Sequence, residues 1–427
     1  MKKARSPASR FSHSRSAKTY LNPRSIRLVW ASSLLLAFAA LAGPKTTYRL
    51  ENNAVFTGPD RGDVWLYPPE TGKWREWYLH ELRVSLRGTH EKRAGYRVEP
   101  RFRFTHQPDS TEQFDWVLDQ GYGFMNPSDR VTFLMGKQRA RWGTGMTYTP
   151  TDNLQSTANP LDPTRYLEGV YLARMDATLP WFSASLLYTP DRDNSEIELP
   201  VPQNTSRMAG ARLYKLVGTW DLYATALHNF DDETNIGGAF SWDSGPLVVY
   251  GEAAYLLREN SNLRHYLDLE QGTVWKPRAV LGGSKLMGNS SIYAEVYYTG
   301  WGLNRSEYAD YLVNLRYVSD PYYWITRPGN PIEYANILLL TKPMQELHQW
   351  YLAASGVYNW RDLWTIGGNF VFDPVDQTLY GYPLVTFLGY PDVDVAAGLS
   401  FVSGPPTSER AVLPAHYSTD LRIIIHF

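Results

Sequence analysis

The chain has 427 residues and no cysteine, and its 42 basic and 43 acidic residues give a formal net charge of −1. The absence of cysteine excludes disulfide frameworks, thiolate metal sites and cysteine nucleophiles, and the balanced charge does not favour nucleic-acid binding. The mean hydropathy of −0.38 is mildly polar, yet the chain has 30 Tyr and 15 Trp residues. Aromatic girdles of a transmembrane β-barrel produce this combination. A soluble all-β enzyme with a sugar-binding cleft is the alternative.

The first 42 residues have the organisation of a secretory signal peptide. Residues 1–27 contain eight Lys or Arg and no acidic residue, and residues 28–42 are apolar except for two serines. This apolar run is shorter than the roughly 20 residues that span a bilayer. It ends in Ala40-Leu41-Ala42, which is typical of a cleavage site. We therefore expect a signal peptide over 1–42 and a single exported domain over 43–427.

The rest of the chain consists mainly of alternating segments separated by turn residues. Side chains of a strand point to opposite faces with period two, so one apolar and one polar face indicate a strand. In residues 113–123, for example, Trp116 and Tyr122 are predicted opposite Asp115 and Asp119. The predicted strands are 46–56, 78–89, 94–106, 113–123, 130–141, 167–178, 181–190, 206–217, 219–230, 235–243, 246–258, 274–286, 290–300, 346–359, 362–373, 377–388, 392–402 and 417–427.

The connections between these segments alternate in length. Short joins, such as those near 89–90 and 217–218, alternate with longer segments such as 142–166 and 301–345. Outer-membrane barrels have short periplasmic turns and longer extracellular loops. The sequence therefore predicts an all-β, transmembrane antiparallel β-barrel of about 18 strands, or of 16 because segment 46–56 alternates poorly. A barrel of this size encloses an aqueous channel, and no residues remain for a plug domain.

Residues 136–169 form the most distinctive segment. A tryptophan followed by two glycines allows a tight backbone path with positive φ, and the Asn-Pro-Leu-Asp-Pro run at 159–163 stiffens the stretch beyond it. We expect this loop either to fold into the lumen and narrow it or to cover the barrel mouth. The candidate constriction residues are Trp142, Gly143, Gly145, Asp152, Asn159 and Asp162.

The same segment carries a resemblance to known proteins. It contains Gly-Lys-Gln-Arg, then Trp-Gly, then Asn-Pro-Leu-Asp-Pro and Glu-Gly. This pattern resembles a segment of a family of poorly characterised porin-like outer-membrane proteins of Gram-negative bacteria. The resemblance covers only this segment. It implies a barrel that passes small solutes but no particular solute, because analogy of fold is a weak basis for function.

Charged residues recur on the predicted lumen faces of three strands before residue 142. A charge that faces lipid at the bilayer centre costs about 2–4 kcal/mol, so these residues should face the lumen or lie beyond the membrane. Phe133 and Met135 have the same parity as Arg139 and Arg141, so the strand either leaves the lipid zone there or contains a bulge. Facing charges would select solutes by charge, whereas salt-bridged packing within the wall is the alternative. The candidate pore-lining residues are Arg97, Arg101, Arg103, Asp115, Asp119, Arg139 and Arg141.

The chain has no recognisable catalytic or metal-binding motif. Its histidines are scattered, without an H-E-x-x-H pair or a Gly-x-Ser-x-Gly elbow, and it has no phosphate-binding loop or dinucleotide fingerprint. We interpret each histidine after the signal peptide, His348 included, as a polar lumen or interface residue. The acidic run 231–233 is interpreted as a solvated loop. We therefore expect no enzyme activity, no cofactor and no bound metal.

Residues 417–427 end the chain on an alternating strand. Leu421 and Ile423 share a face with Phe427, and Arg422 lies on the other face. A terminal strand that ends in phenylalanine is similar to the closing strand of bacterial outer-membrane barrels, whose apolar face meets lipid and lipopolysaccharide. We expect the barrel-assembly machinery to bind this strand and Phe427.

These observations lead to two hypotheses of function. The leading one is a porin-like channel of the bacterial outer membrane for small hydrophilic solutes, with no nucleic-acid partner. The rival is a non-channel barrel that assists export or assembly of surface polysaccharide, or binds a surface ligand through its loops. Aromatic residues of segment 301–345 favour the rival, because aromatic side chains suit sugar contact. They are Trp301, Tyr308, Tyr311, Tyr322, Tyr323 and Trp324. Charge selectivity and oligomeric state stay open.

Overall fold

The computed structural model describes residues 45–57, 75–90, 93–106, 113–154, 161, 169–190, 207–230, 233–258, 274–319, 344, 346–405, 407–409 and 417–426. The predicted signal peptide and the terminal Phe427 lie outside these residues. In the described part of the chain, no helix combines the length and apolar character needed to cross a membrane.

The described chain from Lys45 onwards is an 18-stranded antiparallel sheet with one helix among the described residues. Each predicted segment overlaps one strand, so 18 rather than 16 is the correct number. The strands are β1 (Lys45–Thr57), β2 (Arg75–His90), β3 (Ala94–His106), β4 (Gln113–Ser128), β5 (Val131–Gln138), β6 (Val170–Thr178), β7 (Ser183–Thr189), β8 (Met208–Val217), β9 (Trp220–Asn229), β10 (Glu233–Asp243), β11 (Leu247–Arg258), β12 (Val274–Met287), β13 (Ser290–Thr299), β14 (Trp350–Trp360), β15 (Trp364–Asp373), β16 (Thr378–Tyr390), β17 (Val393–Ser403) and β18 (Tyr417–His426).

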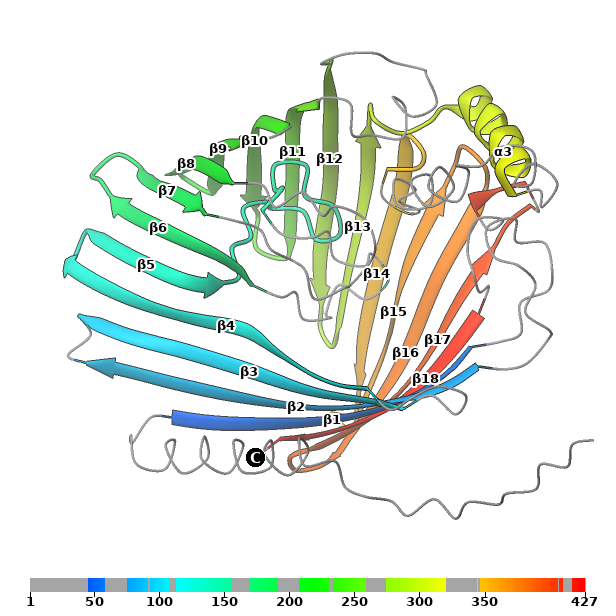
Figure 1. Cartoon of the computed structure of the whole chain (residues 1–427), viewed down its shortest axis with the longest axis horizontal. Helices are drawn as coiled ribbons and strands as arrows, with labels where there is room; N and C mark the ends of the chain where they lie inside the picture. Colours follow the sequence, from blue (N-terminus) through cyan, green and yellow to red (C-terminus); the bar gives the residue numbers. More distant parts are fainter. Residues whose placement is uncertain are drawn as a thin grey trace, which may run out of the picture. The chain divides into compact units, whose positions relative to one another are not determined.

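The sheet closes into a barrel. Each strand pairs with the next along the chain, as Figure 1 shows around the wall. The first strand, β1, also pairs with the last, β18, from Arg49 opposite His426 to Thr57 opposite Ser418. The sheet therefore has no free edge.

The two faces of the wall differ in exposure. On β11, Ala253 and Tyr255 are exposed, whereas Glu252, Ala254 and Leu256 are buried. An exposed apolar face around a closed barrel is the surface that lipid contact requires, so the buried and polar face encloses the interior.

The two ends of the barrel differ in their connections. Short turns join β2 to β3, β4 to β5 and the later pairs up to β16 and β17, and the start of β1 and the end of β18 lie at this same end. Apart from the short links β9–β10 and β15–β16, the other end carries the longer connections. We call it the long-loop end. The alternation agrees with the predicted pattern, and the assignment of this end to the cell exterior stays a prediction.

A β-bulge in β4 corrects one predicted face. The pairing of β3 with β4 shifts between Glu99 and Pro100, so that Asp119 and Gln120 follow each other and are both buried. An extra residue in one strand reverses the faces beyond it. Tyr122 therefore lies on the interior face with Gln120, and its predicted position on the same face as Trp116 is wrong.

The strand predicted over 130–141 is shorter than expected. As β5 it ends at Gln138, so Arg139 and Arg141 follow the strand instead of belonging to it. Phe133 and Met135 are exposed on the lipid-facing side. Because Arg139 and Arg141 lie beyond the strand, the parity that they share with these residues does not place them on that side.

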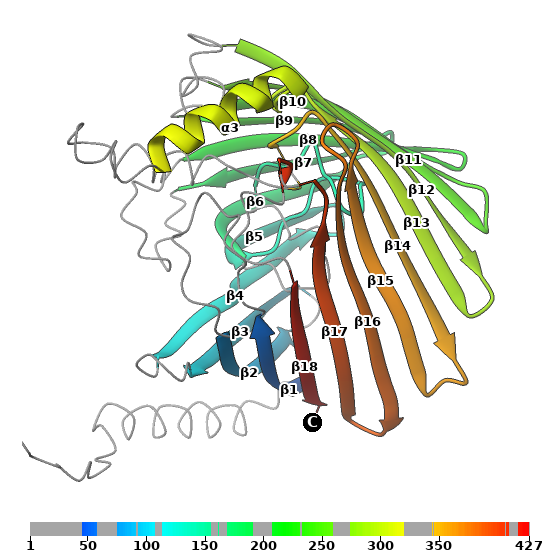
Figure 2. The same cartoon turned by 90° about the vertical axis from the view of Figure 1, so that its right-hand side faces the viewer.

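The helix α3 (Arg305–Ser319) lies within the connection between β13 and β14 and was not predicted. A capping box begins it: the Asn304 side chain accepts hydrogen bonds from the backbone N–H groups of Ser306 and Glu307, and the Glu307 carboxylate accepts one from the N–H of Asn304. Figure 2 shows α3 at the opposite end of the barrel from the short turns.

The glycine at position 136 generates a prediction about folding. Gly136 has a φ of 128°, and a Cβ there would lie 2.2 Å from the backbone oxygen of Gly121. We expect Gly136→Ala to lower the free energy of unfolding by about 1–3 kcal/mol, because a side chain forces strain at this φ. Urea unfolding of the barrel refolded in lipid vesicles measures the change. Gly123→Ala is the control, since its Cβ would lie 3.7 Å from the nearest atom, the oxygen of Gly95. Equal midpoints for the two variants would contradict the prediction.

Candidate functional site

The connection between β5 and β6 leaves the wall and enters the barrel. Residues 139–154 contact the inner faces of β10, β11, β12 and β13, which lie far along the chain and around the barrel from β5. Figure 1 shows this segment as a blue-green trace against β11–β13. We call residues 139–154 the inner loop.

One carboxylate on β11 holds the first part of the inner loop. Glu252, 3% exposed, accepts hydrogen bonds from the backbone N–H groups of Thr144, Gly145 and Thr151, at 2.6 Å from Gly145 and 3.1 Å from Thr151. The hydroxyls of Thr144 and Thr151 also donate to it, at 3.2 and 2.8 Å. Hydrogen bonds to a charged acceptor contribute about 1.5–3 kcal/mol each, so this carboxylate is a strong anchor.

A second carboxylate, on β13, holds the middle of the loop. Glu295 is also 3% exposed and accepts from the N–H groups of Met146, Thr147 and Tyr148, at 2.9 Å from Thr147 and 3.2 Å from Tyr148. The hydroxyl of Tyr250 on β11 donates to the same carboxylate at 2.8 Å. Two buried glutamates thus satisfy backbone N–H groups that have no partner strand.

Aromatic side chains pack the loop against the wall. Tyr148 stacks on Tyr297 of β13 with ring centroids 4.3 Å apart, and its hydroxyl donates to the backbone oxygen of Met344 at 2.8 Å. Trp142, 2% exposed, belongs to a buried cluster with Leu154 and with Leu227 of β9. The predicted Trp142 is therefore an anchor of the loop rather than an exposed residue.

The predicted glycines are needed for space and not for positive φ. Neither Gly143 nor Gly145 has a positive φ, so the predicted reason is wrong. A Cβ on Gly145 would lie 1.9 Å from the backbone oxygen of Tyr148, and one on Gly143 would lie 2.6 Å from the Thr149 side chain. Both positions exclude a side chain because the loop folds tightly on itself.

Asp152 organises the loop from within. Its carboxylate accepts hydrogen bonds from the backbone N–H groups of Trp142 and Leu154, both at 2.9 Å. Burial raises the pKa of Asp152 above its usual value, although these two hydrogen bonds oppose the change. The remaining candidates of the loop, Asn159 and Asp162, lie outside the described residues.

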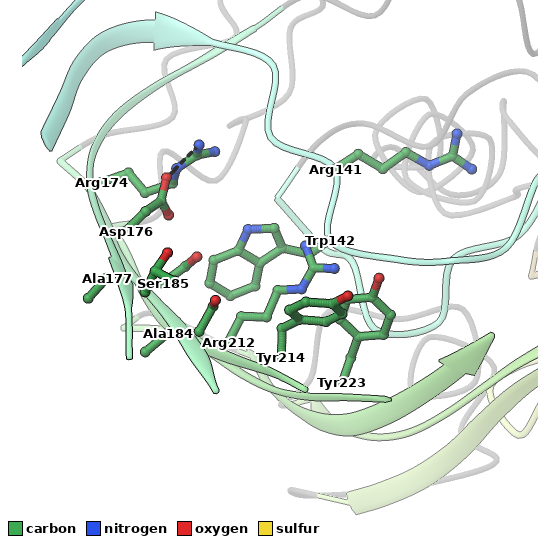
Figure 3. Close-up of a pocket in the computed structure, with 12 residues that line it drawn as sticks. Arg141, Trp142, Arg174, Asp176, Ala177, Ala184, Ser185, Arg212, Tyr214 and Tyr223 are labelled. Atoms are coloured by element: carbon green, nitrogen blue, oxygen red, sulfur yellow. Dashed lines mark hydrogen bonds and ion pairs between the residues drawn. The ribbon is translucent and has the colours of Figure 1, made fainter. Parts of the chain in front are cut away.

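A cavity of about 350 Å³ lies between the start of the inner loop and the wall formed by β6–β9. Figure 3 shows Trp142 between the Arg174–Asp176 pair on one side and Arg212 on the other. The Arg174 and Asp176 side chains lie 2.8 Å apart, and the Arg212 guanidinium lies 4.3 Å from the Tyr223 ring centroid. With Arg141 also in its lining, the cavity presents three arginines and one aspartate. This lining suits a small solute that carries negative charge.

The predicted charged residues of β3 and β4 lie together on one part of the inner wall. Arg101 forms ion pairs with Asp119 at 3.0 Å and with Glu81 of β2 at 3.4 Å, and Arg103 lies 3.8 Å from Asp115. Only 9% of the Arg101 side chain is exposed, so this residue mainly packs within the wall.

Other members of this patch reach the open interior. The side chain of Arg97, paired with Glu99 at 2.5 Å, is 39% exposed. Arg139 is 27% exposed and lies 3.8 Å from Glu99 and 4.0 Å from Asp119, so the start of the inner loop joins the patch. We call these residues of β2–β4, with Arg139, the charged wall. The sequence missed Glu81 as a partner. It left open whether the charges pack or face solute: Arg101 packs within the wall, and a role for the more exposed members in meeting solute stays a prediction.

Arg141 takes another position. Its guanidinium donates to the backbone oxygens of Gly145 and Met146, the latter at 2.9 Å, and lines the cavity rather than the charged wall. It therefore holds the turn of the inner loop as well as contributing charge.

The two glutamates that anchor the loop were missed by sequence reasoning. Each is a single acidic residue on the interior face of a strand whose neighbours are small, apolar or aromatic, in Tyr-Gly-Glu252-Ala-Ala and Tyr-Ala-Glu295-Val-Tyr. A lone acid at such a position is the available signal, since a buried carboxylate requires hydrogen-bond donors.

Comparisons with known proteins give a fold and no sequence family. No protein-family model matches the chain, and no curated protein is similar to it in sequence. Among solved structures, OccAB1 of Acinetobacter baumannii is similar with a TM-score of 0.57 at 10% identity, over 90% of this chain and 98% of that one. OccAB3 of the same species has a TM-score of 0.54 at 9% identity, over 90% and 99%. A BenF-like porin from Pseudomonas fluorescens Pf-5 has a TM-score of 0.53 at 8% identity, over 90% and 98%.

At such low identity the likeness concerns the fold. The chain shares the closed-barrel fold of these porins. The resemblance of the segment 136–169 to a porin-like family stays a prediction.

The two anchoring glutamates give a testable expectation. In the double variant Glu252→Gln, Glu295→Gln we expect amide hydrogen exchange of residues 144–151 to rise by about tenfold or more, because each N–H loses a charged acceptor. Exchange of the refolded barrel, read by mass spectrometry, gives the measurement. Glu51→Gln is the control: Glu51 is also a buried glutamate, and it pairs with Arg49 on β1. Unchanged exchange in the double variant would show that the carboxylates do not hold the loop.

Proposed function

We propose that the chain forms a porin-like channel that passes small hydrophilic solutes across the outer membrane. The observation that carries the proposal is the combination of a closed 18-stranded barrel with a charged interior wall. A barrel of this size encloses an aqueous channel unless other parts of the chain fill it. The likeness to porins supports the fold and the location on which the proposal rests.

In this proposal the inner loop is the constriction. It crosses to the inner faces of β10–β13 and narrows the space that remains beside the charged wall. Six backbone N–H groups of the loop donate to Glu252 and Glu295 of the wall. These bonds and the aromatic contacts support a fixed rather than a mobile constriction.

The arginines support a preference for anionic solutes. Arg97 and Arg139 reach the interior on one side, and Arg141 and Arg212 line the cavity on the other. OccK2 (OpdF) of Pseudomonas aeruginosa, similar to this chain with a TM-score of 0.53 at 8% identity over 90% of it and 96% of that chain, was solved in complex with glucuronate. A carboxylated solute of that size is a suitable first candidate here.

The rival hypothesis loses part of the feature that favoured it. Trp301 and Tyr308 are each 4% exposed and Tyr311 is fully buried, so these three rings pack within the protein instead of offering a surface to a sugar. The later aromatic residues of segment 301–345 lie outside the described residues.

Planar-bilayer recording tests the channel directly. We expect purified, refolded protein to give discrete conductance steps, and the double variant Glu252→Gln, Glu295→Gln to give larger or fluctuating steps, because a released loop no longer holds the constriction. Glu51→Gln should behave as the native protein. Correctly folded protein that gives no steps would refute the channel, and native conductance in the double variant would refute the role of the loop.

A second recording tests the arginines. Arg139→Ala, alone and together with Arg141→Ala, should shift the reversal potential in a salt gradient toward cation preference, because positive charge is removed from the narrow part. Arg361→Ala, in the turn between β14 and β15, removes the same charge at the far end of the barrel and serves as the control. If the Arg139 variants show the same reversal potential as Arg361→Ala, neither arginine lines the path.

A further inference from the structure

Four side chains that can bind metal meet at the long-loop end, beside the part of the inner loop where Tyr148 packs on Tyr351. They come from three connections: His348 precedes β14, Asp373 and Asp376 lie at the link between β15 and β16, and Glu409 lies between β17 and β18. The side chains of His348, Asp373 and Glu409 are 0% exposed, and that of Asp376 is 7% exposed. The predicted place of His348 as a polar lumen or interface residue is therefore wrong.

Donor atoms of His348, Asp373 and Asp376 lie close together, and Glu409 approaches the same nitrogen of His348. The Nδ1 atom of His348 contacts Oδ2 of Asp373 and lies 3.1 Å from Oε1 of Glu409 and 3.8 Å from Oδ2 of Asp376. One ligand atom from each of His348, Asp373 and Asp376 lies within 4.8 Å of the others. Ligands bound at the roughly 2.0–2.2 Å typical of zinc have similar mutual separations, so small adjustments suffice.

The charges of this cluster do not balance. Three buried carboxylates face one imidazole, and no Lys or Arg of the described chain forms an ion pair with them. With all three carboxylates ionised, even a protonated His348 would leave two negative charges without a counter-charge. Tyr351 and Tyr380 donate hydrogen bonds to Glu409, but hydrogen bonds do not neutralise charge, and buried unpaired charge is costly.

Two polar atoms beside this cluster have no hydrogen-bond partner. The Tyr308 hydroxyl, on α3, is buried without a hydrogen-bond partner, as is Nε2 of His348. The Tyr308 ring meets the His348 imidazole edge-on, with centroids 4.2 Å apart. A buried hydroxyl left unpaired on a ring that packs against the imidazole indicates that a further group belongs there.

We propose that His348, Asp373, Asp376 and Glu409 bind one divalent transition-metal ion, with Zn²⁺ as the best match. One imidazole nitrogen and three carboxylate oxygens form a mixed donor set that zinc and manganese accept, whereas Ca²⁺ and Mg²⁺ prefer oxygen alone. Four protein donors leave no open position, as in a structural site. The ion supplies the missing positive charge and joins three connections at the long-loop end, beneath α3.

The proposal is tested by metal binding to the whole barrel. Refolded protein is stripped with a chelator, dialysed, and titrated separately with Zn²⁺, Mn²⁺ and Ca²⁺ in a calorimeter, with thermal unfolding followed in parallel. We expect one equivalent of Zn²⁺ or Mn²⁺ and a higher unfolding temperature when it is bound. Folded wild-type protein that takes up neither ion, or takes up Ca²⁺ alone, would overturn the proposal.

Two variants and a control locate the site. Asp376→Asn and Glu409→Gln should each weaken binding by about tenfold or more, because each loses a charged ligand. Asp376 lies in a link and is the safer change if Glu409→Gln does not refold. Asp394→Asn is the control, since Asp394 pairs with His426 at 3.0 Å at the short-turn end. Native affinity in Asp376→Asn would place the ion elsewhere and refute these ligands.

Discussion

The pairing of β1 with β18 is the constraint on which the rest of the structure depends. In a bilayer every backbone N–H and C=O group must find its partner within the protein, so a sheet that crosses lipid must close. β1 pairs with β18 on one side and with β2 on the other. Without β1, the strands β2 and β18 would each expose an unpaired edge to lipid. Its backbone pairing on both sides explains why a segment with poor alternation still forms a strand.

Closure creates an interior that must satisfy its own polar groups. The inner loop has no neighbouring strand, so its backbone N–H groups lack the carbonyl partners that adjacent strands provide within the wall. Glu252 and Glu295 face the opposite problem, because a carboxylate on the interior face of a strand requires donors that the saturated wall cannot give. The loop N–H groups donate hydrogen bonds to the two carboxylates, so that both sets of polar groups are satisfied. The loop position is therefore determined by two residues more than 100 positions away in the chain.

What the sequence could predict follows from the range of the interactions involved. Period-two alternation is a local property, and it predicted the strands, their number and the outward face of residues such as Leu421. The bulge that turns Tyr122 inward depends on how β3 and β4 pair, which alternation in one strand does not reveal. The capping box at Asn304 is a local signal for α3, but it lies within a segment that was predicted as a long connection.

The candidate site was less accessible to prediction for the same reason. Arg101, Asp119 and Arg139 were identified because charge on a predicted strand face must avoid lipid, and they do lie together. Their partner Glu81 and the loop anchors Glu252 and Glu295 lie on other strands, so only the closed barrel brings them near. Likewise His348 and Glu409 are 61 residues apart, and spacing in sequence gives no sign that they meet.

The positions of the inner loop and of the His348 cluster indicate where the proposed solute path runs. The inner loop occupies the inner faces of β10–β13, and the cluster around His348 and Glu409 ties down the connections next to β14–β18. Two described surfaces beside the loop are the charged wall on β2–β4, where Arg97 and Arg139 are partly exposed, and the cavity against β6–β9, which Arg212 lines. A solute that passes beside the loop therefore meets arginines on the wall that the loop leaves uncovered. The same glutamates that fix the loop then determine which charges the solute encounters.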